Sequence, residues 1–253
     1  MSDFFWFSDS QWARIEPLLP SGLRGARRVD DRRVLSGIVH ALQCGGRWGD
    51  CPEHVYGPKK TLYNRFVRWA ERGVWEGIFN ALAGADGVPD RLFIDSTCIK
   101  VHRTAGGAKG GPLANGIGQT RGGRNSKVHA ICDAKGRPHV LMITPGNVHD
   151  MRVAKACIAA MPPSAELVGD KGYCSNDLRV WLAQRGTQAI IPNKRNRKVQ
   201  HECDPAIYRQ RNVIERMFCR IKDWRRVATR FDRNLKNFMA TVAIAATVIW
   251  WLK

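Results

Sequence analysis

Residues 91–101 read RLFIDSTCIKV, an apolar and partly β-branched run that is interrupted by one carboxylate, Asp95. Side chains of this kind favour an extended backbone, so the run predicts a strand. A carboxylate that is buried without a partner costs free energy unless it binds a cation. The segment therefore predicts the first strand of a sheet and a functional role for Asp95.

The chain after this strand alternates between strand and helix patterns. Asp133-Ala134-Lys135-Gly136 is a turn signal between two apolar runs, so three successive strands are expected to form an antiparallel meander. We expect further strands at 126–132, 138–144, 166–168 and 188–191, and helices at 150–160, 177–185, 208–225 and from 236 onward. The order βββαβαβα is that of a mixed α/β, RNase H-like fold.

A second carboxylate, Asp170, follows the apolar run 167–169 at the point where a strand should end. In a βββαβα order the first and fourth strands lie side by side, so Asp95 and Asp170 are expected to converge. The third candidate, Glu215, belongs to the helix expected at 208–225.

At about 100° per residue, Tyr208, Arg211, Glu215 and Lys222 lie within a stripe of about 60° on that helix. If this face packs over the sheet edge, Glu215 completes a carboxylate triad, and Arg211 and Lys222 can neutralise phosphates beside it. The alternative is a solvated helix on which the charges align by chance.

Three carboxylates suit Mg²⁺ or Mn²⁺, hard cations that keep positions open for water and phosphate. Two such ions held by Asp95, Asp170 and Glu215 would clamp the attacking and leaving oxygens of an in-line displacement at phosphorus. The nucleophile would be water for cutting, or a DNA 3′ hydroxyl for joining. The sequence has no Gly-Lys-Ser/Thr phosphate loop, so we expect no nucleotide cofactor.

Residues 1–88 show a different pattern, that of a small all-α domain. Ser8-Asp9-Ser10 and Asp30-Asp31 are helix starts, and Pro58 suits the first residue of a third helix. We expect helices at 8–20, 30–45, 59–72 and 75–82, and a linker at 84–89. The sequence thus predicts an N-terminal helical DNA-binding domain at 1–88 and a catalytic domain at 89–253.

The third helix of this region carries a basic, outward face: Lys59, Lys60, Asn64, Arg65 and Arg68. Three short helices with a basic third one resemble a helix-turn-helix module, in which such side chains reach phosphates and base edges in the major groove. The alternative is a solvated basic face on a structural bundle.

The charge balance of the 253 residues points to a polyanionic partner. Lys and Arg number 41 against 22 Asp and Glu, a net charge of +19, and nucleic acid is the commonest partner for such a chain; a basic surface without function is the alternative. Residues 1–6 lack the features of a secretory signal, and the longest apolar stretch, 238–252, is too short to span a bilayer. We expect a cytoplasmic protein with no membrane contact.

At its acidic residues the sequence resembles the DDE transposases of bacterial insertion sequences, specifically the insertion sequence five group of the insertion sequence four superfamily. The signature of that superfamily is a Tyr, two residues, an Arg, three residues, a Glu, six residues and a Lys. It is matched in full by Tyr208, Arg211, Glu215 and Lys222.

Three further blocks carry the resemblance, which extends over almost the whole chain. FIDST at 93–97 and GDKGY at 169–173 are similar to the family's blocks around its metal-binding aspartates, and GNVHD at 146–150 also resembles the family.

The resemblance implies that Asp95, Asp170 and Glu215 bind the two divalent ions, Mg²⁺ or Mn²⁺. It also implies that Tyr208, Arg211 and Lys222 contact DNA near the cleaved phosphate. The implied partners are double-stranded DNA, in the form of terminal inverted repeats and target DNA, and further copies of the chain in a homodimer or higher assembly. The implied location is the bacterial nucleoid.

Two other functions stay open on the residues alone. One is a catalytically silent DNA-binding protein, such as a repressor or a domesticated transposase, and the other is an RNase H-like nuclease that cuts without joining. The intact set of three acids argues against the first, and the basic helical region together with the full signature argues against the second.

Overall fold

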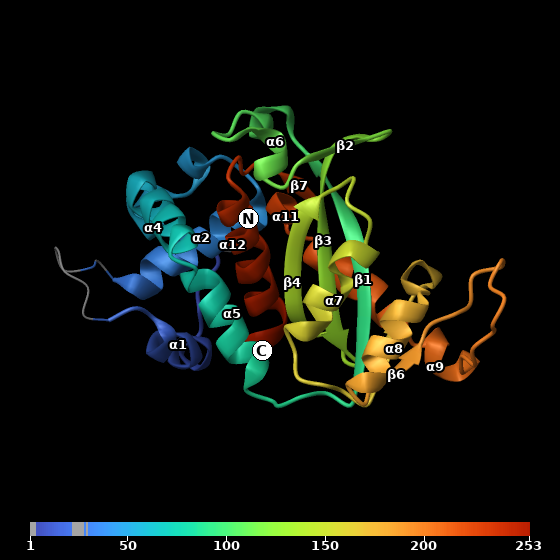
Figure 1. Ribbon diagram of the computed structural model, residues 1–253. Coiled ribbons are helices and arrows are strands. Elements are labelled where there is room, and N and C mark those ends of the chain that lie inside the picture. The colour runs from blue at the N-terminus through green and yellow to red at the C-terminus, as the bar shows by residue number, and fades with distance from the viewer. Residues whose placement is uncertain (1–3, 22–27, 29) are drawn as a thin grey trace.

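A mixed sheet forms the centre of the protein in the computed structural model, which describes residues 4–21, 28 and 30–253 (Figure 1). The central strand β1 pairs antiparallel with β3 on one side and parallel with β5 on the other. The five main strands are β1 (Arg91–Val101), β3 (Gly123–Asp133), β4 (Pro138–Pro145), β5 (Glu166–Gly169) and β6 (Gln188–Ile190). β4 continues the sheet beyond β3 and β6 continues it beyond β5. The resulting order, β4-β3-β1-β5-β6, confirms the mixed α/β class and fits an RNase H-like sheet.

Two very short strands were not expected from the sequence. They are β2 (Gly118–Thr120) and β7 (Thr229–Arg230). β2 pairs with the first residues of β3, and β7 pairs with the end of β1. Strands of two or three residues carry no periodic pattern, so only their tertiary partners define them.

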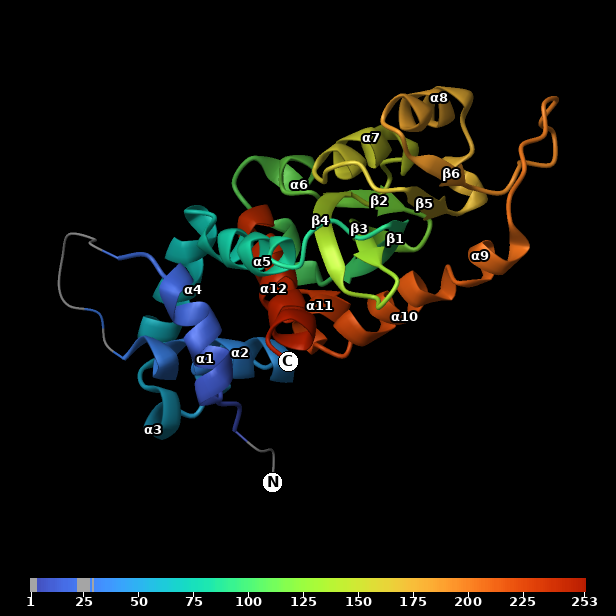
Figure 2. The same cartoon turned by 90° about the horizontal axis from the view of Figure 1, so that it is seen from below.

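Helices cover both faces of the sheet (Figure 2). One face packs against α7 (Met151–Ala159) and α8 (Asn176–Gln184), and the other against α10 (Asn212–Ile221) and α12 (Leu235–Ala246). Successive side chains of a strand point to opposite faces. Leu92 and Ile94 accordingly lie in the apolar cluster with α7 and α8, while Phe93 and Ile99 lie in the cluster with α10 and α12.

The N-terminal region is helical, as the sequence predicts. Its helices are α1 (Asp9–Ile15), α2 (Asp31–Cys44), α3 (Glu53–Tyr56), α4 (Lys59–Glu71) and α5 (Val74–Gly84). The Ser8 side chain caps α1 by accepting from the Gln11 amide, and Gly45 ends α2 with a left-handed backbone, φ 76°. The short helix α3 was not expected.

The last helix, α12, joins the N-terminal helices to the sheet. It packs against α4 and α5 and against β4, and side chains of all these elements belong to one hydrophobic cluster. Phe238, near its start, is 0% exposed. The helix expected from residue 236 onward is confirmed, and it is buried. The division of the chain into two domains after residue 88 stays a prediction.

The helix expected at 208–225 is interrupted. It consists of α9 (Pro205–Arg209), α10 and the short α11 (Arg225–Ala228). Between α9 and α10 the amide of Arg211 bonds to the carbonyl of Tyr208, and that of Ile214 to the carbonyl of Arg211. These tighter i to i+3 bonds replace one α-helical turn, a local change that the side-chain pattern does not encode.

The remaining α-helix of the described residues is α6 (Gly111–Ala114), which lies near β2 beside the end of the sheet (Figure 1). Nowhere in residues 4–21, 28 and 30–253 is there a helix with the length and apolarity that a bilayer crossing requires.

Replacing Phe238 tests the role of α12. Phe238→Ala leaves a cavity where the helices meet the sheet, and we expect the free energy of unfolding, measured by urea denaturation, to fall by about 3–5 kcal/mol. Phe238→Leu should cost less, and Val180→Ala, at an exposed position on α8, should change the free energy by no more than about 0.5 kcal/mol. A Phe238→Ala protein as stable as the wild type would contradict this role.

Candidate active site

Asp95 and Asp170 are brought together by the pairing of β1 with β5. Ile94 is the partner of Gly169 in this parallel register, and Asp95 and Asp170 are the residues that directly follow this pair. The Asp170 side chain accepts a hydrogen bond from the Gly172 amide at 2.8 Å. A Cβ at Gly172 would lie 2.8 Å from Asp170 Oδ1, so a side chain there would displace the Asp170 carboxylate. The expected adjacency of the first and fourth strands is confirmed.

Asp95 is held on the face of the sheet that α10 covers. Its Oδ1 accepts from the Ser96 amide at 2.8 Å, and its Oδ2 accepts from Arg211 at 3.1 Å. Burial raises the pKa of Asp95 from 3.8 to about 6, and the charges of Asp170 and Asp150 also raise it, against the lowering effects of the Ser96 amide and Arg211. The site therefore carries more negative charge than its own donors and cations stabilise.

Glu215 reaches this site through Arg211. Arg211, at the start of α10, donates one guanidinium nitrogen to Asp95 and places another 2.9 Å from Glu215 Oε1. The Glu215 side chain is 58% exposed and the Asp95 side chain 19% exposed. Asp95 and Glu215 thus share one guanidinium, while Asp170 lies beside Asp95 directly after β5.

The rest of the predicted signature faces the same side of β1. Tyr208 lies beside the Arg211 guanidinium; burial works to lower the pKa of Arg211, but Tyr208, Asp95 and Glu215 raise it. Lys222, at the end of α10, donates to Thr97 Oγ1 at 2.6 Å. Asp95 and Thr97 are two residues apart on the strand, so their side chains share one face of β1. Arg211 and Lys222 therefore bind successive positions on the face that α10 covers.

The donor chemistry fits a hard divalent cation. The acids offer carboxylate oxygens, the ligands that Mg²⁺ and Mn²⁺ prefer. Arg211 stands in for a positive charge between Asp95 and Glu215, and the raised pKa of Asp95 shows that further positive charge would be stabilising. As the side chains stand, no three His, Cys, Asp or Glu within the described part of the chain are close enough to hold a metal ion.

The basic face predicted on the third helix is found in part. Lys59, Lys60, Asn64 and Arg68 of α4 are exposed. The prediction that Arg65 points outward is wrong, because its side chain is only 11% exposed. It pairs with Asp31 of α2, and its guanidinium lies 5.0 Å from the Trp69 ring centroid. An arginine at the edge of a helix face gains more from an acid and an aromatic ring on its own bundle than from solvent.

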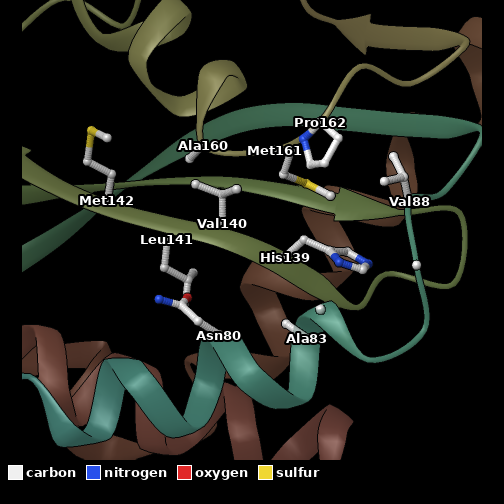
Figure 3. Close-up of a pocket in the computed structure, with 12 residues that line it drawn as sticks. Asn80, Ala83, Val88, His139, Val140, Leu141, Met142, Ala160, Met161 and Pro162 are labelled. Carbon is white, nitrogen blue, oxygen red and sulfur yellow. The ribbon is translucent and has the colours of Figure 1, made fainter.

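A cavity of about 490 Å³ lies elsewhere, between α5, the segment after it and β4. Figure 3 shows His139, Val140, Leu141 and Met142 of β4 between Asn80 and Ala83 on one side and Ala160, Met161 and Pro162 on the other. None of the predicted acids lines this cavity. This cavity is therefore separate from the carboxylate site.

These features define a class of protein: a nucleic-acid-processing enzyme with an RNase H-like sheet and two aspartates side by side, one within β1 and one directly after β5. Residues 86–250 match the family described as "Transposase DDE domain", and residues 7–79 match "Putative transposase of IS4/5 family". The chain belongs to the DDE transposases of bacterial insertion sequences, in the IS4/5 group, as its signature predicts.

Similar proteins include two insertion-sequence products. A putative transposase of element IS6501 from Brucella ovis is 31% identical over 127 residues, which cover 49% of this chain and 97% of the relative. A putative transposase of element IS402 from Burkholderia cepacia is 30% identical over 175 residues, which cover 64% of this chain and 79% of the relative.

A solved structure supports the fold. The piggyBac transposase, in a synaptic complex with hairpin DNA, aligns with a TM-score of 0.51 over 95% of this chain and 70% of its own, at 11% sequence identity. At this identity the likeness concerns the fold alone.

The sequence assigned no role to Asp150, which the structure places near Asp95. It belongs to the block GNVHD, which resembled the family, but nothing in that block showed which strand it would approach. Asp150 stands immediately before α7, and its charge acts on Asp95. A carboxylate at the start of a helix is common for local reasons, so only the fold distinguishes this one.

The pKa of Asp95 generates a prediction for the metal-free protein. Because its folded-state pKa of about 6 lies above the ordinary value of 3.8, ionisation of Asp95 lowers stability as the pH rises from about 4 to about 6, and the loss is then constant at higher pH. Asp95→Asn should therefore be more stable than wild type at pH 7–8 in EDTA, by at most roughly 3 kcal/mol, and the difference should vanish near pH 4. Urea denaturation across this range measures it. A constant difference, like that expected for the exposed control Asp177→Asn, would contradict the raised pKa.

Proposed function

We propose that this transposase binds the terminal inverted repeats of its own insertion sequence and catalyses metal-dependent cleavage and strand transfer there. The observation that carries the proposal is the position of Asp95 and Asp170 on neighbouring strands, with Glu215 linked to Asp95 through Arg211. Such a site gathers carboxylates where β5 ends beside β1, and the largely exposed Glu215 gives a DNA backbone a point of approach.

Asp95, Asp170 and Glu215 are the residues that would hold two Mg²⁺ or Mn²⁺ ions. Bound there, the ions would stabilise charge on the attacking and leaving oxygens at phosphorus. Asp170 is oriented by the Gly172 amide and Asp95 by the Ser96 amide, so each carboxylate has one oxygen fixed before any ligand binds. Preorganised ligands lower the free energy that must be spent on ordering the site.

Arg211 has two roles in this proposal. Without ligands its guanidinium neutralises Asp95 and Glu215. When divalent ions take over that neutralisation, the guanidinium becomes free to bind a DNA phosphate, for which its planar fork is well suited. Tyr208 and Lys222, on either side of it along the chain, would bind the same stretch of backbone.

The N-terminal helical region would hold the DNA end while the carboxylates act on it. We assign DNA binding to residues 1–88, in a helix-turn-helix-like arrangement, and catalysis to residues 89–253. Exposed Lys59, Lys60, Asn64 and Arg68 supply positive charge and hydrogen-bond donors along one face of α4. Joining two element ends to one target requires two sites, so we propose a homodimer or a higher assembly on DNA in the nucleoid.

Removing one acid tests the catalytic part of the proposal. Asp95→Asn, Asp170→Asn and Glu215→Gln should each lower cleavage and strand transfer by roughly a hundredfold or more, because each removes charge that the transition state needs. The measurement uses a labelled duplex with an element end and its flank, with Mg²⁺ or Mn²⁺, and gel-shift binding is recorded in parallel. Binding should be retained.

Glu202→Gln, an exposed acid in the 192–205 segment, is the matched control and should keep wild-type activity. A wild-type protein that binds the duplex and performs no chemistry would instead favour a catalytically silent DNA-binding protein. Cutting without joining would favour an RNase H-like nuclease.

Neutralising α4 tests the binding part. Lys59→Ala, Lys60→Ala and Arg68→Ala should each weaken binding to the element end, and the slope of log K against log salt should become shallower by about 0.9 for each phosphate that the protein no longer neutralises. Arg14→Ala, at an exposed position on α1, controls for net charge alone. Equal effects of Arg14→Ala and the α4 variants would show that α4 is a solvated basic face.

A further inference from the structure

A charged cluster lies behind the proposed catalytic carboxylates, on the opposite face of β1. Asp95 faces α10, so the next side chain, Ser96, faces α7. The Ser96 hydroxyl donates to Asp150 Oδ1 at 2.8 Å, while the Ser96 amide donates to Asp95 Oδ1 at 2.8 Å. One residue of the strand therefore joins the two carboxylates across the sheet.

Asp150 is itself fixed by strand β3. Lys127 Nζ lies 3.0 Å from Asp150 Oδ1 and also donates to the Val148 carbonyl at 2.8 Å. The Lys127 side chain is 13% exposed, so this pair is not a solvated surface pair of little energetic weight. His129 Nδ1 lies 3.7 Å from the same Asp150 oxygen. Burial lowers the pKa of His129 to about 4, which leaves Lys127 as the positive charge of the cluster.

Tyr173 closes the cluster from the side of β5. It is 1% exposed, and its ring lies against Gly169, where a Cβ would come within 3.4 Å of it. Burial raises the pKa of Tyr173, and so do the charges of Asp150, Asp95 and Asp170. Among the residues that the structure describes, neither the buried Tyr173 hydroxyl nor the buried His129 Nδ1 has a hydrogen-bond partner. Buried polar groups of this kind are costly and are retained mainly where they serve a site.

We propose that Asp150 is a positioning residue for the metal-binding carboxylates, an inference that rests on the proposed function. Anchored by Lys127, Asp150 holds the Ser96 hydroxyl and thereby fixes the Ser96 backbone. The Ser96 amide then keeps Oδ1 of Asp95 in place, and Oδ2 is left for the cation that Arg211 now replaces. Asp150 acts through Ser96 because it lies on the far face of the sheet from α10.

Binding of Mn²⁺ to the DNA-free protein, measured by calorimetry and by electron paramagnetic resonance, tests this role without reference to activity. Partners that orient metal ligands usually contribute 10- to 100-fold in affinity. We expect Asp150→Ala and Ser96→Ala to raise the Kd for Mn²⁺ by about tenfold or more. The double variant Asp150→Asn with Lys127→Met keeps an oxygen for Ser96 and leaves no buried charge unpaired, so it should restore much of the affinity.

Asp177→Ala is the matched control. Asp177 also lies at the start of a sheet-covering helix and pairs with a lysine, Lys155, at 2.8 Å, but it is 76% exposed and away from β1. Asp177→Ala should leave the Kd for Mn²⁺ unchanged.

The Mg²⁺ concentration for half-maximal cleavage should rise in Asp150→Ala, with a smaller change in the rate at saturating Mg²⁺.

The outcomes separate the two proposals. Wild-type affinity in both Asp150→Ala and Ser96→Ala, with weak binding in Asp95→Asn, would overturn the positioning role and leave the proposed function standing. Unchanged Mn²⁺ binding in Asp95→Asn would overturn the metal site itself, and the inference with it. Ser96→Ala removes one oxygen only, so it decides the question if Asp150→Ala does not fold.

Discussion

The parallel pairing of β1 with β5 is the constraint on which the site depends. It aligns Ile94 with Gly169 and so brings two carboxylates to the same edge of a sheet whose interior is apolar. Mutual repulsion and burial make that arrangement unfavourable for the free protein, as the raised pKa of Asp95 shows. Hydrogen bonds from backbone amides and the Arg211 guanidinium offset part of this unfavourable free energy. Both are positioned by elements that pack on the sheet.

The position of α10 is set by hydrophobic packing. Its apolar side chains Val213, Met217 and Phe218 pack into the cluster under the sheet, which turns Arg211 and Lys222 toward β1. A helix that packs by one face presents the adjoining positions at fixed angles. The electrostatic part of the site is therefore held by hydrophobic packing, and ion pairing alone would not suffice to hold Glu215, which is largely exposed.

Much of this could be predicted from sequence, because periodic patterns report local structure. The bounds of β1 and the meander followed from the residue pattern, and the two aspartates, one within an apolar strand and one directly after another, were singled out by the cost of buried charge. What could not be predicted depends on local backbone geometry or on tertiary contacts. The interruption of the helix before Arg211 arises from local i to i+3 bonds. Arg65 turns inward because α2 offers Asp31, and the place of Asp150 becomes visible only when α7 is packed against β1 and β3.

The position of α12 has a consequence for the synthesis of the protein. This helix follows every element that it holds together, since α4, α5 and β4 all precede it in the chain. While a ribosome is still translating the first 234 residues, the parts of these elements that α12 covers stay exposed and open to aggregation or to chaperones. This part of the core closes only after the helix leaves the exit tunnel.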